Sequence, residues 1–278
     1  MRTLYISDLD GTLLHSNAEL SKFTAATVNS LVDRGMIFSY ATARSYHSAS
    51  KVTAELTERI PVIVFNGTFI LENGTRRKLF ENSFSESEAV YILDVLFSGG
   101  VYPFVHRYKD ETETFVYLQE HLSRGAKAFA AERENDPRRR TAREKTELYG
   151  NGIFHFTCID EKEKLEPLFE RLKNDFHCIF YVDPYGGEQW LEVQPKGATK
   201  ANAVKELKRI MNCHKIVCFG DAVNDLSMFS VADECYAVAN ACEELKRIAT
   251  GVIPSNDEDG VANWLLNNFE GEENEILS

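Results

Sequence analysis

The sequence predicts an α/β protein, with a doubly wound parallel sheet that has helices on both faces and is interrupted by an inserted α+β domain. Three observations lead to this prediction. Nearly apolar segments alternate with amphipathic segments over residues 3–80, the pattern changes near residue 85, and the first pattern returns after Pro195. We therefore expect a discontinuous core at residues 1–84 and 191–278, and an insertion at residues 85–190.

The first part of the core has the alternation of a βαβαβ unit. Its expected strands are almost uniformly apolar, which is typical of a parallel sheet covered on both faces. Ser21 and Ser45 are suitable N-caps for the two helices between these strands. We expect strands at 3–7, 36–41 and 61–65, helices at 21–35 and 45–59, and a hairpin at 69–80 that turns on Asn73 and Gly74.

The insertion and the second part of the core follow different patterns. In the insertion, strand-like segments with hairpin signals between them indicate an antiparallel arrangement. After Pro195, helix and strand patterns alternate again. The expected insertion elements are helices at 85–97 and 163–174 and strands at 102–108, 113–119, 151–159, 177–183 and 188–194. In the core we expect helices at 199–211, near 223–231, after 239 and at 260–269, with strands at 215–219 and 235–239.

Composition narrows the classes of function. The formal net charge of −12 argues against a general nucleic-acid binder, which usually carries a basic surface. No segment has the apolar length of a membrane span, and charged residues come too early for a signal peptide. The six cysteines form no C-x-x-C pair. We expect a cytoplasmic protein with no nucleic-acid or membrane partner. The oligomeric state is not readable from the sequence, and a monomer is compatible with it.

Polar side chains follow four of the expected core strands directly. The carboxyl ends of parallel strands meet at one edge of a sheet, where ligands bind in open α/β folds. Each short motif alone has a simpler explanation, since Asp-Gly and Asn-Gly are common turns. Their position at one edge makes a joint site the better interpretation. The residues are Asp8, Asp10 and Gly11, then Thr42 and Arg44, then Asn66 and Gly67, and finally Asp221, Asn224 and Asp225.

Four aspartates at one edge would repel one another strongly in a partly dry site. Either some are protonated or a cation lies among them. Oxygen ligands without a neighbouring His or Cys favour Mg²⁺. Lys200 is expected in the first turn of a helix, where the helix dipole disfavours a cation, so an anion bound beside it and an ordinary surface lysine are equally compatible with this segment.

Four motifs in order resemble the haloacid dehalogenase (HAD) superfamily, and most closely its Cof-type sugar-phosphate phosphatases, subfamily IIB, which have a large inserted cap of the C2 type. The motifs are DLDGTLL, ATAR, PKGATK and GDAVND. NGTFI and NDEDGVA are similar to further Cof segments. One departure is Ala43, where Cof relatives usually have glycine. The resemblance implies a Rossmann-like core, a cap formed by the insertion, and an Mg²⁺-dependent phosphatase acting on small phosphorylated metabolites.

The resemblance also implies a role for each motif residue. Asp8 would be the nucleophile that forms an aspartyl phosphate, and Asp10 the general acid and base, kept protonated in the first step by anionic surroundings. Thr42 and Lys200 would complete the catalytic set. Phosphate or substrate contacts would come from Gly11, Thr42, Arg44, Asn66, Gly67, Lys200 and Asn224. Magnesium ligands would be Asp8, the Asp10 carbonyl and Asp221, with Asn224 or Asp225 in or behind the first shell.

Several alternatives stay open. A phosphomutase or a disaccharide-phosphate phosphatase would carry the same motifs, and a non-catalytic sensor of phosphorylated ligands belongs to a different class. Hexose phosphates, nucleotides, and flavin or pyridoxal phosphates all remain possible substrates. In the insertion, the triplet 138–140 is interpreted as a solvated run of arginines. Candidate substrate contacts there are His106, Arg107, Tyr181 and Tyr185.

Overall fold

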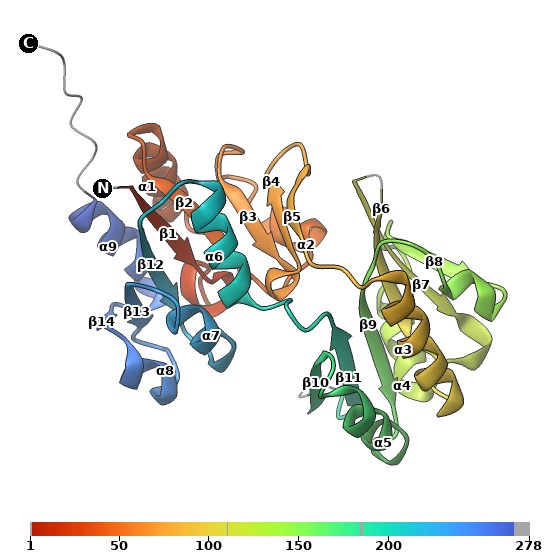
Figure 1. The fold of residues 1–278 in the computed structure, drawn as a ribbon. Helices are drawn as coiled ribbons and strands as arrows, with labels where there is room; N and C mark the ends of the chain where they lie inside the picture. The colour runs from red at the N-terminus through yellow and green to blue at the C-terminus, as the bar shows by residue number, and fades with distance from the viewer. Residues whose placement is uncertain (1, 110, 184–185, 270–278) are drawn as a thin grey trace, which may run out of the picture. The chain divides into compact units, whose positions relative to one another are not determined.

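The computed structural model describes residues 2–109, 111–183 and 186–269 (Figure 1). The chain forms two compact units, one combining the residues up to Glu81 with those from Thr199 onward, the other spanning Asn82–Ala198. The second unit is therefore longer than the predicted 85–190. Strand β11 (Gln189–Gln194) pairs along its length with strand β10 (His177–Val182), so a boundary at residue 190 would cut a paired strand.

The first unit contains an eight-stranded sheet with the order β14-β13-β12-β1-β2-β3-β4-β5. The strands from β14 to β3 are parallel, and β4 and β5 are added as an antiparallel hairpin. The predicted α/β fold with a parallel core is thus confirmed. The strands are β1 (Thr3–Ser7), β2 (Ile37–Ala41), β3 (Pro61–Val64), β4 (Phe69–Glu72), β5 (Lys78–Glu81), β12 (Lys215–Gly220), β13 (Glu234–Val238) and β14 (Gly251–Ile253).

Helices cover both faces of this sheet. In β1, β3 and β12 nearly every residue is buried, and because successive side chains point to opposite faces, neither face is open to solvent. Contacts join α1 to α9 and α6 to α7, and Figure 1 shows α6 lying across the sheet. The helices are α1 (Lys22–Asp33), α2 (Tyr46–Val52), α6 (Lys200–Ile210), α7 (Leu226–Phe229), α8 (Glu243–Ile248) and α9 (Gly260–Asn268).

Side-chain caps fix where these helices begin. The hydroxyls of Ser21, Ser45 and Thr199 each accept a hydrogen bond from a backbone N–H in the first turn, as predicted for the two serines. Helix α2 is shorter than the predicted 45–59. Its end is set by a tertiary contact, because the Asn29 side chain donates to the Glu55 carbonyl and accepts from the Thr57 N–H.

The second unit contains a six-stranded sheet with the order β10-β11-β9-β6-β7-β8. One face packs an apolar cluster against α3 and α5, and the other packs a smaller cluster against α4. Helix α4 and strand β8 were not predicted, since their segment reads as polar and rich in arginine. The remaining elements are α3 (Glu86–Ser98), β6 (Phe104–Lys109), β7 (Thr112–Leu118), α4 (Arg124–Glu132), β8 (Arg139–Ala142), β9 (Ile153–Asp160) and α5 (Lys162–Leu172).

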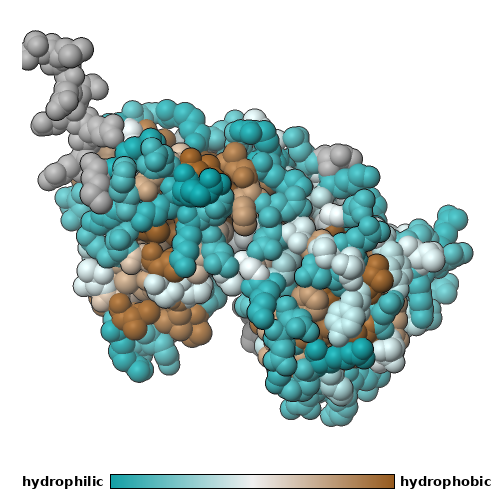
Figure 2. Space-filling view, viewed as in Figure 1, coloured by the Kyte–Doolittle hydropathy of each residue, from teal (hydrophilic) through white to brown (hydrophobic). Residues whose placement is uncertain are grey.

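The surface agrees with the acidic, polar composition. Figure 2 shows a largely hydrophilic face with apolar residues in separate patches. Among the described residues no helix has both the length and the apolar character needed to cross a bilayer.

Candidate active site

Apart from Lys200, which begins α6, the predicted site residues of the first unit follow the carboxyl ends of β1, β2, β3 and β12. Asp8 comes directly after β1 and precedes a short helical turn, η1 (Leu9–Leu13). Gly11 within this turn has φ +78°, and a Cβ there would lie 2.4 Å from Asp221 Oδ2. Glycine at this position therefore permits the turn after β1 to approach the loop after β12.

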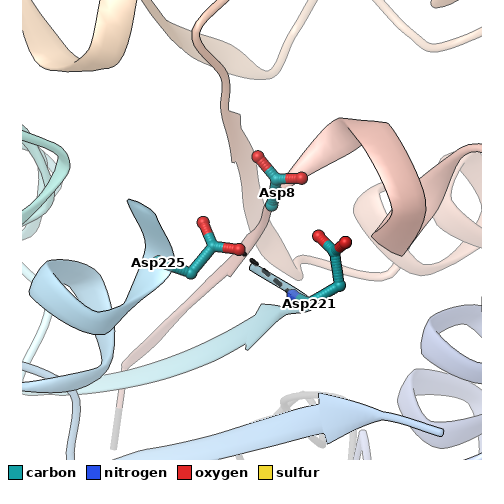
Figure 3. Close-up of side chains that lie close together, drawn as sticks. All are labelled: Asp8, Asp221 and Asp225. Carbon is teal, nitrogen blue, oxygen red and sulfur yellow. Dashed lines mark hydrogen bonds between the residues drawn. The ribbon is translucent and has the colours of Figure 1, made fainter. Parts of the chain in front are cut away.

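Three carboxylates gather between these two loops (Figure 3). Ligand oxygens of Asp8, Asp221 and Asp225 all lie within 4.8 Å of one another. Asp225 is fully buried, and its Oδ2 accepts hydrogen bonds of 3.1 Å from the N–H groups of Asp221 and Ala222. The hydroxyl of Thr12 donates to Asp221 Oδ1 at 2.9 Å. Backbone and hydroxyl donors thus hold two of the three carboxylates in place.

Lys200 provides the positive charge of the cluster. It is only 2% exposed, and its Nζ lies 2.5 Å from Asp8 Oδ1 and 2.7 Å from Asp225 Oδ1. Lys200 is therefore not an ordinary surface lysine, and the anions beside it in the first turn of α6 are two carboxylates of the chain itself. Three carboxylates around one ammonium leave an excess of negative charge in a buried place, which is the electrostatic condition for binding a cation.

The pKa values follow from this crowding. Burial raises the pKa of Asp8 to about 7, against the attraction of Lys200 and with a further contribution from Asp225. Burial also raises the pKa of Asp221, although the Thr12 hydrogen bond opposes it. Burial alone would lower the pKa of Lys200, but the charges of Asp8 and Asp225 outweigh it and raise the pKa above its usual value. Lys200 is therefore a permanent cation.

Asp10 is not part of the carboxylate cluster and pairs with Arg44. Its oxygens accept two hydrogen bonds from Arg44, one of 2.8 Å from Nε and one of 2.5 Å from the terminal amino group. The charged partner of Asp10 in this arrangement is therefore an arginine, which binds both carboxylate oxygens.

The loops after β2 and β3 are joined to each other and to α6. The Thr42 hydroxyl accepts from the Arg44 N–H at 3.1 Å, and the Thr42 carbonyl accepts from the Asn66 N–H at 2.9 Å. Asn66 has φ 53°, and its Oδ1 is buried without a partner among the described residues. A Cβ on Gly67, which has φ +98°, would lie 2.2 Å from the Thr199 carbonyl oxygen. The glycine lets this loop contact the residue that begins α6 and so helps to place Lys200.

Sequence reasoning missed residues that support the turn after β1. The Asn240 side chain donates to the Gly11 carbonyl at 2.7 Å, and Asn256 donates to the Leu14 carbonyl at 2.9 Å. Asp259 accepts from Ser21 and Thr24 and lies 3.0 Å from the His15 ring. Asn256 and Asp259 belong to the NDEDGVA motif, which could be recognised in the sequence. Its contact with a loop some 240 residues earlier in the chain could not be predicted from the sequence.

Asn224 lies exposed in the short turn η5 (Val223–Asp225), while Asp225 is buried in the cluster. Of the two residues left open as metal neighbours, Asp225 is the one whose carboxylate lies with Asp8 and Asp221.

The residues singled out in the insertion lie on its sheet. Arg107 donates to the carbonyls of Glu147 and Tyr149 at 2.8 and 2.9 Å, which is a structural contact. His106 and Tyr181 lie on β6 and β10, and Tyr185 falls outside the described residues. The solvated-run interpretation is wrong for Arg138, whose guanidinium pairs with Glu113 at 2.5 Å and Asp136 at 2.6 Å.

The family model for haloacid dehalogenase-like hydrolases matches residues 5–265. The chain belongs to this family. The resemblance found in the four motifs is thereby confirmed, as is the prediction of an enzyme of the hydrolase class.

Several phosphatases are similar to this haloacid dehalogenase-like hydrolase along nearly its whole length. A 5-amino-6-(5-phospho-D-ribitylamino)uracil phosphatase of Bacillus subtilis (YwtE) is 28% identical, over 93% of this chain and 95% of that protein. A second B. subtilis phosphatase of the same name (YitU) is 27% identical, over 94% of this chain and 96% of that protein. A crystal structure from Thermotoga maritima is 26% identical with a TM-score of 0.79, covering 97% of this chain and 98% of that one.

Proposed function

We propose that this hydrolase is a phosphatase that cleaves small phosphate monoesters by attack of Asp8 on phosphorus. The observation that carries the proposal is the buried Asp8 carboxylate at the end of β1, hydrogen-bonded to Lys200 and grouped with Asp221 and Asp225. A carboxylate nucleophile divides phosphate-ester hydrolysis into two easier displacements. The phosphatase names of the relatives support the same reaction.

The donor set fits Mg²⁺. Asp8, Asp221 and Asp225 offer only oxygen ligands, and the excess negative charge around Lys200 calls for a cation. These three side chains would hold the ion, with the Asp10 carbonyl as a further ligand by family resemblance. When bound, Mg²⁺ would offset negative charge on the phosphoryl oxygens and on Asp8.

The chain's own residues supply the proton transfers. A carboxylate oxygen of Asp8 attacks phosphorus, the bond from phosphorus to the ester oxygen breaks, and Asp10 gives its proton to the departing alkoxide. Asp10 then takes a proton from a water molecule, which attacks phosphorus and releases phosphate and free Asp8. Arg44 must leave Asp10 for the first step, and a phosphoryl oxygen is a suitable new partner for its guanidinium.

The remaining predicted residues would hold the phosphoryl group. The Thr42 hydroxyl, the Lys200 ammonium and the backbone N–H groups of the turn that contains Gly11 are its proposed donors. Asn66 and Gly67 would border the substrate, and the unpartnered Asn66 Oδ1 would accept a hydrogen bond from it. Asn224 would lie at the edge of this site.

The proposed substrates are small phosphorylated metabolites. The two B. subtilis relatives named above act on a phosphorylated polyol attached to a pyrimidine, and we extend that class of alcohol to this chain.

Hydrolysis of p-nitrophenyl phosphate with and without Mg²⁺ tests the proposal. We expect activity that EDTA removes and that Asp8→Asn abolishes, while Asp33→Asn, a change at an exposed aspartate of α1, retains it. A phosphomutase would instead transfer the phosphoryl group to an added sugar, and a sensor would bind phosphate esters without turnover. Activity that persists in Asp8→Asn would refute the mechanism.

A further inference from the structure

The short turn between β13 and α8 contacts both loops that carry the carboxylate cluster. It covers residues 239–242, and Cys242 directly precedes α8. The Asn240 side chain donates to the Gly11 carbonyl at 2.7 Å, and the Cys242 N–H donates to the Asp221 carbonyl at 2.8 Å. A single turn therefore bonds the loop after β1 and the loop after β12.

Asn240 is joined to a second asparagine that holds the same loop. Its Oδ1 accepts from the Asn256 N–H at 3.1 Å, and Asn256 Nδ2 donates to the Leu14 carbonyl at 2.9 Å. The two asparagines thus bond the turn η1 at Gly11 and the residue directly after it. Asn256 is 3% exposed, whereas Asn240 is exposed, so Asn240 can be replaced without opening a cavity in the core.

Gly11 is the residue of η1 at which such a bond has the largest effect. Its positive φ and its close approach to Asp221 require glycine, and glycine restrains the adjacent peptide units less than any other residue does. In a planar trans peptide the carbonyl and the following N–H point in opposite directions. The bond from Asn240 to the Gly11 carbonyl therefore also fixes the direction of the Thr12 N–H.

The groups next to this peptide unit have tasks in the proposed reaction. The backbone N–H groups of the turn are proposed phosphoryl donors, and the Asp10 carbonyl is a proposed metal ligand. The Thr12 hydroxyl holds Asp221 through a hydrogen bond of 2.9 Å. A rotation of the Gly11 peptide would disturb all of these groups. Arg44 must leave Asp10 in the first step, whereas the bond from Asn240 can persist through the whole reaction.

We propose that Asn240 is a positioning residue for the phosphatase reaction. It acts through Gly11 rather than on the substrate. By holding the Gly11 carbonyl, it keeps the N–H groups of the loop after β1 in one direction and keeps this loop at a fixed spacing from Asp221 while Asp10 changes partners. The inference rests on the proposed phosphatase function for the reaction that is positioned, but its effect on the Mg²⁺ site can be measured without turnover.

The test compares Asn240→Ala with Asn29→Ala as the matched control. Asn29 also donates to a backbone carbonyl, that of Glu55, and accepts from a backbone N–H, that of Thr57, but it does so beyond the end of α2. For Asn240→Ala we expect kcat with p-nitrophenyl phosphate to fall by about tenfold or more. The Kd of Mg²⁺, measured by calorimetry with the metal alone, should rise by about tenfold. Asn29→Ala should change neither quantity, although it loses the same two kinds of hydrogen bond.

Asn240→Asp separates the two hydrogen bonds of the Asn240 side chain. It keeps an acceptor for the Asn256 N–H but presents to the Gly11 carbonyl an ionised oxygen that cannot donate, so kcat should fall as in Asn240→Ala.

An unchanged kcat in either folded Asn240 variant would overturn the positioning role, and so would an unchanged Kd of Mg²⁺ in Asn240→Ala. Equal losses in Asn29→Ala would overturn it as well, because they would mark a general loss of stability. If the unaltered protein hydrolyses no ester, the proposed function fails, and the Mg²⁺ affinities of Asn240→Ala and Asn29→Ala still decide the role of Asn240.

Discussion

Replacing Lys200 by methionine should both destabilise the protein and suppress its activity. The Lys200 ammonium is the only cation that hydrogen-bonds Asp8 and Asp225 within the described parts of the chain, and those residues are 5% and 0% exposed. Removing one member of a buried ion pair leaves the other charge uncompensated and costs about 3–5 kcal/mol. In the metal-free protein we therefore expect a loss of unfolding free energy of that size.

The same change should lower turnover by about 10²–10³-fold, the usual effect of removing a preorganised charge that stabilises the transition state. In the metal-free protein, the loss of the Lys200 attraction would also raise the pKa of Asp8, which burial already raises to about 7.

Urea denaturation and p-nitrophenyl phosphate kinetics, each with EDTA and with Mg²⁺, measure both effects. Lys205→Met is the matched control, because Lys205 is exposed on the same helix and should change neither quantity. Magnesium should recover part of the lost stability by supplying another cation, and adding Asp225→Asn should recover part of it without the metal. Equal denaturation midpoints for Lys200→Met and Lys205→Met in EDTA would refute the view that Lys200 neutralises the cluster.

Three further predictions concern the supporting structure. Burial lowers the pKa of His155 in the fold to about 3 from an ordinary 6.5, so the unfolded chain binds the extra proton. Stability should therefore fall progressively as the pH drops from 6.5 towards 3, by up to about 5 kcal/mol, and pH-dependent denaturation of His155→Phe should show a smaller fall. Gly67→Ala would place a Cβ against the Thr199 carbonyl at a positive φ, so calorimetry should show a loss of about 1–3 kcal/mol in the free energy of unfolding. Activity should also fall, because Lys200 follows Thr199. Unchanged activity would argue against that coupling. Asp259→Ala leaves the hydroxyls of Ser21 and Thr24 without their acceptor and should cost about 1–3 kcal/mol in thermal unfolding, whereas Asp257→Ala, at an exposed position, should cost less.

The core and its carboxylates were predictable because their positions depend on the backbone. Asp8 and Asp221 follow apolar strands directly, so recognising two parallel strands is enough to place both at one edge of the sheet. Side-chain partners were less accessible. The pairing of Asp10 with Arg44 joins residues 34 positions apart through rotamers that no periodicity encodes. Helix α2 also ended early because Asn29, on another helix, bonds the backbone beyond it.

The side chains of His155 and Gln194 in the second unit show that the alternation of polar and apolar residues along a strand does not by itself predict burial. In β9 and β11, polar residues at alternate positions read as the solvated face of a half-buried sheet, yet His155 and Gln194 are almost completely buried. Register also matters, because a slip of one residue would exchange His155 for Phe156 on this face of the sheet. The bulge between His106 and Arg107 acts at the same place, since it interrupts the β6 and β9 register directly after the pair of histidines. Arg107 beyond the bulge then bonds backbone carbonyls and holds that end of the strand. The polar side chains of His106 and His155 thus lie together because of strand pairing as much as because of the residues themselves.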